Sequence, residues 1–313
     1  MDPLRLLTAD SGFFTRQEAL SAGHAGYDIA RNVRTGTWIR FRRGAYAFAD
    51  EWRPLSLVGR HQVRTNAVMR SLGDAVALSH VSGCIRHGID VWGIPLDRVH
   101  VTRLDGGPGR IEGDVVHHEG LTLSHDLMRL GDHQVLAPDR CVLEAGSRST
   151  NEAALCLMES GLRSRQYDGD ALSRRFEQMQ SWPFMRHLQV PVRMADPRAG
   201  SVGESRGNWM FWTLGVPRPH SQFEILHPNG ELAGISDWAW PDHRLLGEFD
   251  GRIKYGRLLK PGQDPGDAVF EEKRREDLLR ELSGYGMIRF VWSDYADLGG
   301  CRSRLDRALR RVG

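Results

Sequence analysis

The spacing of hydrophobic residues changes along the chain, and its last third gives the clearest pattern. From residue 201 a helical spacing of apolar residues ends at Gly215, and runs with the two-residue alternation of strands follow. Asn229-Gly230 separates the first two runs and is a strong signal for a two-residue hairpin turn. The predicted elements are a helix over 201–215, strands over 221–226, 232–240 and 244–251, a helix over 267–282, a strand over 287–292 and a helix over 299–312. The pattern therefore predicts the order αβββαβα.

The first 50 residues predict a smaller unit of helices and a hairpin. Gly23 ends the second of two short helices, and Thr15 is suited to cap its start. Ile29 and Val33 lie one turn apart and give a third helix an apolar face. After a break, residues 38–48 alternate as the two strands of a β-hairpin do. Three short helices followed by a hairpin is the order of a winged helix-turn-helix.

Basic residues in this unit form a candidate DNA-contacting surface. The candidates are Arg31, Asn32 and Arg34 on the third helix and Arg40, Arg42 and Arg43 on the hairpin. Such a helix would enter the major groove of DNA, and arginines on the wing would pair with the flanking phosphates. The alternative is a solvated helix face beside an arginine-rich strand. The order of the elements favours DNA binding.

The region between these two parts mixes helices and strands. The predicted elements are helices over 55–73, 149–164 and 168–180 and strands over 98–103 and 114–120. Residues 190–200, with their prolines and small side chains, are predicted to link this region to the last one. We therefore expect an α/β (α+β) fold with a winged helix-turn-helix over 1–52, a mixed α/β middle domain over 53–195 and a restriction-endonuclease-like αβββαβ domain over 196–313.

Histidines are frequent in the middle domain. They are His80, His87, His100, His117, His118 and His125. Their spacing matches no compact metal-binding motif, so we predict ordinary polar or half-buried side chains rather than metal ligands.

Composition limits the class of protein further. A chain of 313 residues with 40% hydrophobic residues can bury more than one core, and its net charge of +2 means that nucleic acid would have to bind at a local basic patch. The four cysteines contain no C-x-x-C pair, which indicates reduced thiols. The N-terminus lacks the features of a signal peptide, and no apolar run approaches about 18 residues. We expect a cytoplasmic protein with no membrane partner.

Three acids interrupt the predicted strands of the last domain. Glu248 and Asp250 are two residues apart and share one face of their strand. If the preceding turn centres near Asp242, the register sets Asp237 almost opposite Gly247 and beside Glu248. Carboxylates this close repel one another and normally persist because they hold a hard divalent cation, Mg²⁺ or Mn²⁺. The alternative is that the acids form ordinary ion pairs, with Arg244, Arg252 and Arg275 as the candidate partners.

The last domain resembles a nuclease superfamily. Its element order and its D-x10-E-x-D spacing resemble the PD-(D/E)XK nucleases, specifically the very-short-patch-repair (Vsr)-like branch. The matching positions are Glu204 in "GESR", Gln222 in "HSQFEI", Asp237 in "ISDWAW", Glu248 and Asp250 in "GEFDG", and the stretch "MIRFVWSDY". The resemblance implies that Asp237 and Glu248 are metal ligands, that Glu204 supports them, and that a metal-activated water cleaves the DNA backbone.

This sequence departs from the superfamily pattern at one position. The lysine expected two residues after Glu248 is replaced by Asp250, as in the Vsr-like pattern. Lys254 and Lys273 are the candidates to take the role of that lysine.

About the first 120 residues resemble a second family, the AbiEi-type antitoxins. The similar stretches are "FFTRQEALSAG", "IARNVRTGTWIRFRRGAYAF" and "ALSHVSGCIRHGIDVW". The resemblance implies a domain that binds operator DNA and represses its own operon, opposite a nucleotidyltransferase toxin as partner. The whole chain resembles actinobacterial proteins that join such a front half to a Vsr-like back half.

Three functions follow as hypotheses. The winged helix delivers a metal-dependent endonuclease to DNA, in phage defence or a toxin–antitoxin setting. Alternatively, the protein is an AbiEi-like antitoxin or transcriptional repressor whose nuclease fold is inert. In the third hypothesis, the last domain is an interaction module only.

Overall fold

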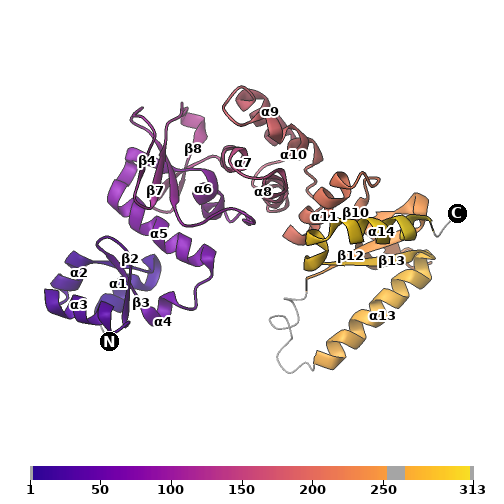
Figure 1. Ribbon diagram of the computed structural model, residues 1–313, viewed down its shortest axis with the longest axis horizontal. Helices are drawn as coiled ribbons and strands as arrows, with labels where there is room; N and C mark the ends of the chain where they lie inside the picture. The colour runs from indigo at the N-terminus through magenta and orange to yellow at the C-terminus, as the bar shows by residue number, and fades with distance from the viewer. Residues whose placement is uncertain (1–2, 252–264, 311–313) are drawn as a thin grey trace. The chain divides into compact units, whose positions relative to one another are not determined.

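The chain forms two compact units of helices and sheets. The computed structural model describes residues 3–251 and 265–310, without the side chains of 265–272 (Figure 1). The first unit comprises Met1–Leu157 and Arg174–Leu188, and the second comprises Met158–Ser173 and Gln189–Gly313. Each unit combines helices with its own sheets, so the expected α+β fold class is confirmed.

The first unit begins with a winged-helix arrangement. Its elements are α1 (Pro3–Ser11), β1 (Phe14–Thr15), α2 (Arg16–Ser21), α3 (Gly26–Arg34), β2 (Trp38–Arg42) and β3 (Ala45–Phe48). The three strands form an antiparallel sheet in the order β1-β3-β2. Thr15 caps α2 as expected, because its hydroxyl accepts the Glu18 N–H and the Glu18 carboxylate accepts the Thr15 N–H at 2.7 Å. Ile29 of α3 packs with Trp38 and Phe48 of the sheet and fixes the orientation of that helix.

A six-stranded mixed sheet forms the rest of the first unit. The helices around this sheet are α4 (Ala49–Trp52), α5 (Leu57–Leu72), α6 (His80–Arg86), α7 (Pro138–Ser147), most of α8 (Asn151–Arg163) and most of α9 (Gly169–Met179). Short 3-10 turns lie at Gly73–Ala75, Ser124–Asp126 and Arg186–Leu188. Its strands are β4 (Val76–Leu78), β5 (Val99–Arg103), β6 (Arg110–Glu112), β7 (Val115–His118), β8 (Leu127–Leu130) and β9 (His133–Leu136). The strand order is β6-β7-β5-β4-β9-β8, and β5 and β7 run parallel. Apolar side chains such as Val68, Leu78 and Val101 are buried between α5 and this sheet.

A buried arginine ties the helices of this unit together. The Arg140 side chain is 2% exposed, and it donates to Asp126 at 2.9 Å and to Glu144 at 2.8 Å. Arg175 of α9 donates to the same Asp126 at 2.7 Å and to Asp139 at 2.9 Å. Because a buried charge is costly unless it is paired and hydrogen-bonded, these four ion pairs specify where α7 and α9 lie.

The second unit has the element order predicted from the sequence. Its elements are α10 (Gln189–Met194), α11 (Val202–Thr213), β10 (His220–Leu226), β11 (Leu232–Trp240), β12 (Leu245–Asp250), α13 (Pro265–Ser283), β13 (Gly286–Val291) and α14 (Leu298–Arg310), with 3-10 turns at Pro241–His243 and Trp292–Ala296. The sheet order is β10-β11-β12-β13, with β12 and β13 parallel and the other pairs antiparallel. Helices α11 and α14 pack on one face around Phe211 and Trp238, and α13 packs on the other through Leu279 (Figure 1).

The boundary between the units differs from the expected one at residue 195. The predicted linker 190–200 contains α10, and the Asp196 side chain is buried. Glu159 accepts the Asp196 N–H at 3.2 Å, and Arg163 donates to the Ala199 carbonyl at 2.8 Å. These bonds attach the end of α8 to the second unit, which is why this segment is ordered structure rather than a linker.

Two further observations concern the environment of the chain. Among the helices that the structure describes, none combines the length and the apolar character that crossing a bilayer requires. Cys84, Cys141, Cys156 and Cys301 are all buried free thiols, in agreement with the prediction from their spacing.

We expect the stability of the second unit to depend on the ionisation of Glu159. Burial raises the pKa of this carboxyl from 4.5 to about 7, because its hydrogen bonds from Asp196 and Asn208 offset the loss of hydration only in part. A folded-state pKa above the unfolded value means that stability is lost as the pH rises from 4.5 through about 7. Urea unfolding of wild type should therefore lose about 2 kcal/mol relative to Glu159→Gln between pH 5.5 and pH 8.5. Parallel pH profiles of the two proteins would contradict this expectation.

Candidate functional site

The exposed face of α3 carries an aromatic residue and two arginines. Tyr27 is 73% exposed, and Arg31 and Arg34 follow it at the four- and three-residue steps that place side chains on one side of a helix. Ile29 is buried and Val33 packs against the same core, so the opposite face holds the helix in place. Tyr27 was not among the predicted contacts, although its spacing from Arg31 in the sequence could have indicated it.

The three residues of α3 that were predicted to contact DNA differ in their exposure and in their pairing. Arg34 is exposed in the last turn of the helix. Arg31 is exposed but donates to Asp28 at 2.6 Å, and Asp28 also accepts the Ala25 N–H that precedes the helix. Asn32 is half-buried beside the core. Arg34 is therefore the residue of this helix best placed to meet a phosphate.

The wing presents two of its three predicted arginines to solvent. Arg40 and Arg43 are exposed, and Arg43 lies in a two-residue turn with Gly44, whose φ of 76° suits glycine. Arg42 Nη1 instead forms an ion pair with Asp114 Oδ1 of the middle domain at 3.0 Å, and the arginine side chain is only 22% exposed. The cause is a β-bulge between Arg40 and Arg42, which shifts the register and turns Arg42 away from solvent. Arg42 is therefore less accessible than Arg40 and Arg43, and its contact with DNA stays a prediction.

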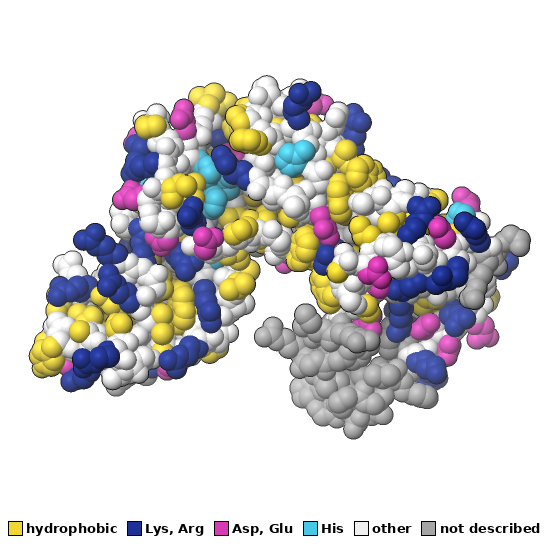
Figure 2. Space-filling view, viewed as in Figure 1, with side chains coloured by type: hydrophobic (Ala, Val, Ile, Leu, Met, Phe, Trp, Pro, Cys, Tyr) yellow, Lys and Arg dark blue, Asp and Glu magenta, His cyan; other side chains and the backbone are white. Residues whose placement is uncertain are grey.

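Basic side chains are visible over the surface of the winged helix in the space-filling view (Figure 2). Arg16, which the sequence analysis did not select, is exposed at the start of α2, and its guanidinium lies next to Gly26 at the start of α3. The backbone N–H of Arg16 also donates to the Gly44 carbonyl of the wing turn at 3.0 Å. Arg16 thus contacts both α3 and the wing turn.

In the second unit the structure brings Glu204, Gln222 and Asp237 together. The Gln222 amide donates to Glu204 Oε2 at 2.8 Å and lies 3.5 Å from Asp237 Oδ1. Gln222 has a φ of 50° and is skipped in the ladder between β10 and β11, where Ser221 pairs with Trp238 and Phe223 with Ser236. This local distortion allows the amide to contact both carboxyl groups.

Glu204 is a buried acid at the start of α11. Ser201 caps the helix and donates its hydroxyl to Glu204 at 2.9 Å, and the Gly200 N–H donates to the same carboxyl at 2.8 Å. Burial, followed by the negative charge of Asp237, raises the pKa of Glu204. The two acids are therefore close enough to repel each other.

Glu248 has arginine partners. Its side chain is 8% exposed, Oε1 accepts from Arg275 of α13 at 2.6 Å, and Oε2 lies 3.7 Å from Arg289 of β13. Asp237 Oδ2 accepts the Phe249 N–H at 2.8 Å. This is the ion-pair alternative that the sequence analysis left open, with Arg275 as the partner.

The remaining predicted residues are spread over β12 and α13. Trp238 pairs with Gly247, so the predicted register of Asp237 was off by one residue. Asp250 is half-buried at the end of β12, and Lys273 is exposed on α13. Lys254 lies outside the described residues, as does Arg252.

A divalent cation does not fit these acids as they are arranged. Both oxygens of Glu248 face guanidinium groups, which occupy the positions where a cation would bind. Among the described residues, Glu204, Asp237, Glu248 and Asp250 do not form a group of three acids with ligand atoms within 4.8 Å of one another. We therefore derive no hydrolytic step from this arrangement.

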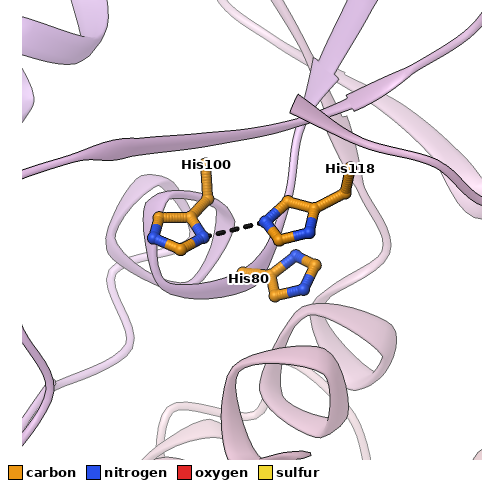
Figure 3. A group of neighbouring side chains, drawn as sticks. All are labelled: His80, His100 and His118. Atoms are coloured by element: carbon orange, nitrogen blue, oxygen red, sulfur yellow. Dashed lines mark hydrogen bonds between the residues drawn. The ribbon is translucent and has the colours of Figure 1, made fainter. Parts of the chain in front are cut away.

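Three histidines of the middle domain do lie together, against the prediction from their spacing (Figure 3). His80, His100 and His118 each offer a ring nitrogen within 4.8 Å of the others. His100 and His118 lie on adjacent parallel strands, where the pairing of Thr102 with His118 sets both histidines on one face. This contact depends on strand pairing, so the linear spacing could not reveal it. His87 lies apart, and its Nε2–H donates to the Leu136 carbonyl at 2.8 Å.

The three imidazoles are neutral at physiological pH. Burial lowers the pKa of His100 to about 4 and that of His118 to about 3, and it lowers the pKa of His80 well below the ordinary value. The neighbouring imidazoles and the positive charge of Arg148 add to the effect of burial on His80 and His118. Neutral imidazole is the form that offers a lone pair.

The comparisons with known proteins identify similar chains without a stated activity. No family model matches this chain. It is similar to two uncharacterized proteins of Mycobacterium tuberculosis, MT2308 of strain CDC 1551 / Oshkosh and Rv2248 of strain ATCC 25618 / H37Rv. Each is 24% identical over 284 residues, which cover 90% of this chain and 95% of the relative. The similarity therefore extends over nearly the full length of both chains.

We expect the effects of substituting Glu248 and Arg275 on the free energy of unfolding to be coupled. Arg275→Gln should destabilise the second unit because it leaves a buried carboxylate with less compensation, whereas the double variant with Glu248→Gln should recover part of the loss. Because the Arg275 side chain is 39% exposed, solvent screening limits the coupling to about 1–2 kcal/mol. Urea unfolding of the four proteins in this cycle measures it. If the two single substitutions changed the free energy of unfolding additively, the ion pair would contribute nothing to stability.

Proposed function

We propose that this protein binds duplex DNA through its winged helix and acts as a repressor-type regulator. The observation that carries the proposal is the exposed face of α3, with Tyr27, Arg31 and Arg34, in a fold whose wing adds Arg40 and Arg43. In a winged helix the third helix enters the major groove while the wing contacts the backbone. Arginine suits both tasks because its fork binds phosphates and base edges.

The resemblance to AbiEi-type antitoxins supports the same role. It adds the expectation that the DNA is an operator of the protein's own operon and that a cognate toxin is the protein partner. We place this activity in the cytoplasm, which the four free thiols support because disulfides are rare there.

Neutralising the exposed arginines should weaken DNA binding. We expect Arg34→Ala, Arg40→Ala and Arg43→Ala each to lower the affinity for a duplex from the upstream region of the protein's own gene by about five- to tenfold. Each lost phosphate contact should also reduce the slope of log K against log salt by about 0.9. Fluorescence anisotropy with labelled duplexes, at several salt concentrations, measures both quantities.

Arg129→Ala provides the matched control for these variants. Arg129 is 59% exposed on β8, outside the winged helix, so its loss removes one positive charge without touching the proposed interface. Equal effects of Arg129→Ala and Arg34→Ala would contradict docking through α3. Absence of binding to any duplex at low salt would overturn the proposed function.

Metal-dependent endonuclease activity is the second candidate. The contact of Gln222 with both Glu204 and Asp237, and the resemblance of these positions to the Vsr-like branch, favour it. The ion pairs of Glu248 oppose it, because Arg275 would have to release this acid before Mg²⁺ or Mn²⁺ could bind. The geometry therefore supports an inert nuclease fold better than an active one.

Plasmid cleavage distinguishes the two candidates. We expect wild type with Mg²⁺ or Mn²⁺ to nick supercoiled DNA no faster than Asp237→Ala does, because Glu248 is held by arginines. Arg275→Gln tests whether releasing Glu248 restores activity. Metal-dependent nicking by wild type that disappears in Asp237→Ala, but persists in Arg40→Ala, would establish the endonuclease instead.

A further inference from the structure

We propose that His80, His100 and His118 form a binding site for a divalent transition-metal ion such as Zn²⁺. The site lies in the middle domain and is independent of both the winged helix and the acids of the second unit. Nothing in the proposed DNA-binding function requires it.

The backbone brings the three side chains together from three elements. His100 lies on β5, His118 is the last residue of β7, and His80 is the first residue of α6 (Figure 3). His80 adopts a φ of 48°, a conformation that costs energy for a residue with a side chain. The surrounding structure therefore imposes the position of this histidine, as it often does at functional sites.

The distances suit a metal centre. His100 Nδ1 and His118 Nε2 are 2.9 Å apart, and one nitrogen of each of the three rings lies within 4.8 Å of the others. Zinc binds histidine nitrogens at about 2.0–2.1 Å, so nitrogens of a tetrahedral site lie roughly 3.3 Å apart. A small outward movement of His118 from His100 would exchange their hydrogen bond for two metal bonds.

A buried carboxylate lies beside the cluster. Glu144 is 4% exposed, and Arg140 donates to its Oε1 at 2.8 Å. Its other oxygen, Oε2, lies 3.3 Å from His80 Nδ1, and the same ring nitrogen lies 3.1 Å from Ser79 Oγ. Histidines that bind metals usually present their second nitrogen to a carboxylate or carbonyl, which orients the ring. A bound cation would also compensate the negative charge at Oε2.

The other side of the cluster is held by hydrogen bonds. Ser82 Oγ accepts the His100 N–H at 2.8 Å and lies 2.9 Å from His61 Nε2. His61 Nδ1 in turn lies 3.1 Å from the Leu96 carbonyl. These bonds fix the backbone of His100 and leave its ring to face His118.

The donor set decides the class of ion. Imidazole nitrogens suit Zn²⁺, Co²⁺, Ni²⁺ and Cu²⁺, whereas Mg²⁺ and Ca²⁺ require oxygen ligands. Three protein ligands leave a fourth tetrahedral position for water or a substrate, as in catalytic zinc sites. His100 and His118 are half-buried rather than enclosed, so an ion can reach them. Histidine side chains are visible at the surface of this unit in Figure 2.

A neighbouring positive charge opposes the binding of a cation to the cluster. Removing this charge therefore tests the proposal. Arg148 is exposed, and its positive charge acts on all three imidazoles. If the cluster binds a metal ion, removing this charge should strengthen binding. If the cluster instead binds an anion such as phosphate, removing the same charge should weaken it.

The experiment uses the full-length protein, freed of metal by a chelator and then dialysed. We expect titration with Co²⁺ to give the visible absorption of a four-coordinate ion at one ion per chain, and calorimetry with Zn²⁺ to give the same stoichiometry. His100→Ala and His118→Ala should each weaken Zn²⁺ binding at least tenfold. His125→Ala, which removes a 64% exposed histidine of the same domain, should leave it unchanged.

Arg148→Ala completes the test and does not depend on the histidine variants being folded. We expect it to bind Zn²⁺ severalfold more tightly than wild type does, and circular dichroism confirms folding of every variant. The proposal is overturned if wild type binds no Co²⁺ or Zn²⁺ in one-to-one stoichiometry, or if binding survives in the folded His100→Ala variant. It is equally overturned if Arg148→Ala binds Zn²⁺ more weakly, or if calorimetry detects inorganic phosphate at the cluster that Arg148→Ala loses.

Discussion

The middle domain depends on the buried ion pairs that the guanidinium of Arg140 forms. This guanidinium is buried with two carboxylates, Asp126 and Glu144, and Arg175 brings α9 to the first of them. Removing one partner of such a network costs about 3–5 kcal/mol, because the remaining charge stays buried without compensation. The same interaction holds Glu144 with one oxygen toward Arg140 and the other toward His80. The stability of this domain and the geometry of its histidine cluster therefore have a common origin.

Pairing of opposite charges also decides which residues can take part in function. The sequence predicts a DNA contact for Arg42, but this side chain forms an ion pair with Asp114. It predicts a metal contact for Glu248, but this side chain forms an ion pair with Arg275. Arg34, Arg40 and Arg43 remain exposed on the winged helix. A surface that binds DNA needs such exposed charges, because each phosphate contact releases counterions only if the guanidinium reaches the phosphate.

The chain thus combines a winged helix with a unit that contains the element order αβββαβα. Glu204, Gln222 and Asp237 lie together, while Glu248 serves as an ion-pair partner for α13 and β13. In the repressor that we propose, the second unit contributes stability or a surface for a partner. The histidine cluster lies in the first unit and would give the protein a dependence on metal that is separate from either role.

Local sequence patterns determined most of the secondary structure. The helical spacing of Ile29 and Val33, the cap at Thr15 and the alternation along β11 each act within a few residues, so the winged helix and the αβββαβα order follow from the sequence alone. Only the tertiary structure decided which charges are paired, because Arg42 meets Asp114 and Glu248 meets Arg275 across long stretches of chain. The histidine cluster was likewise invisible in the sequence. Its members are 18 to 38 residues apart, and the parallel pairing of β5 with β7 and the turn into α6 bring them into contact.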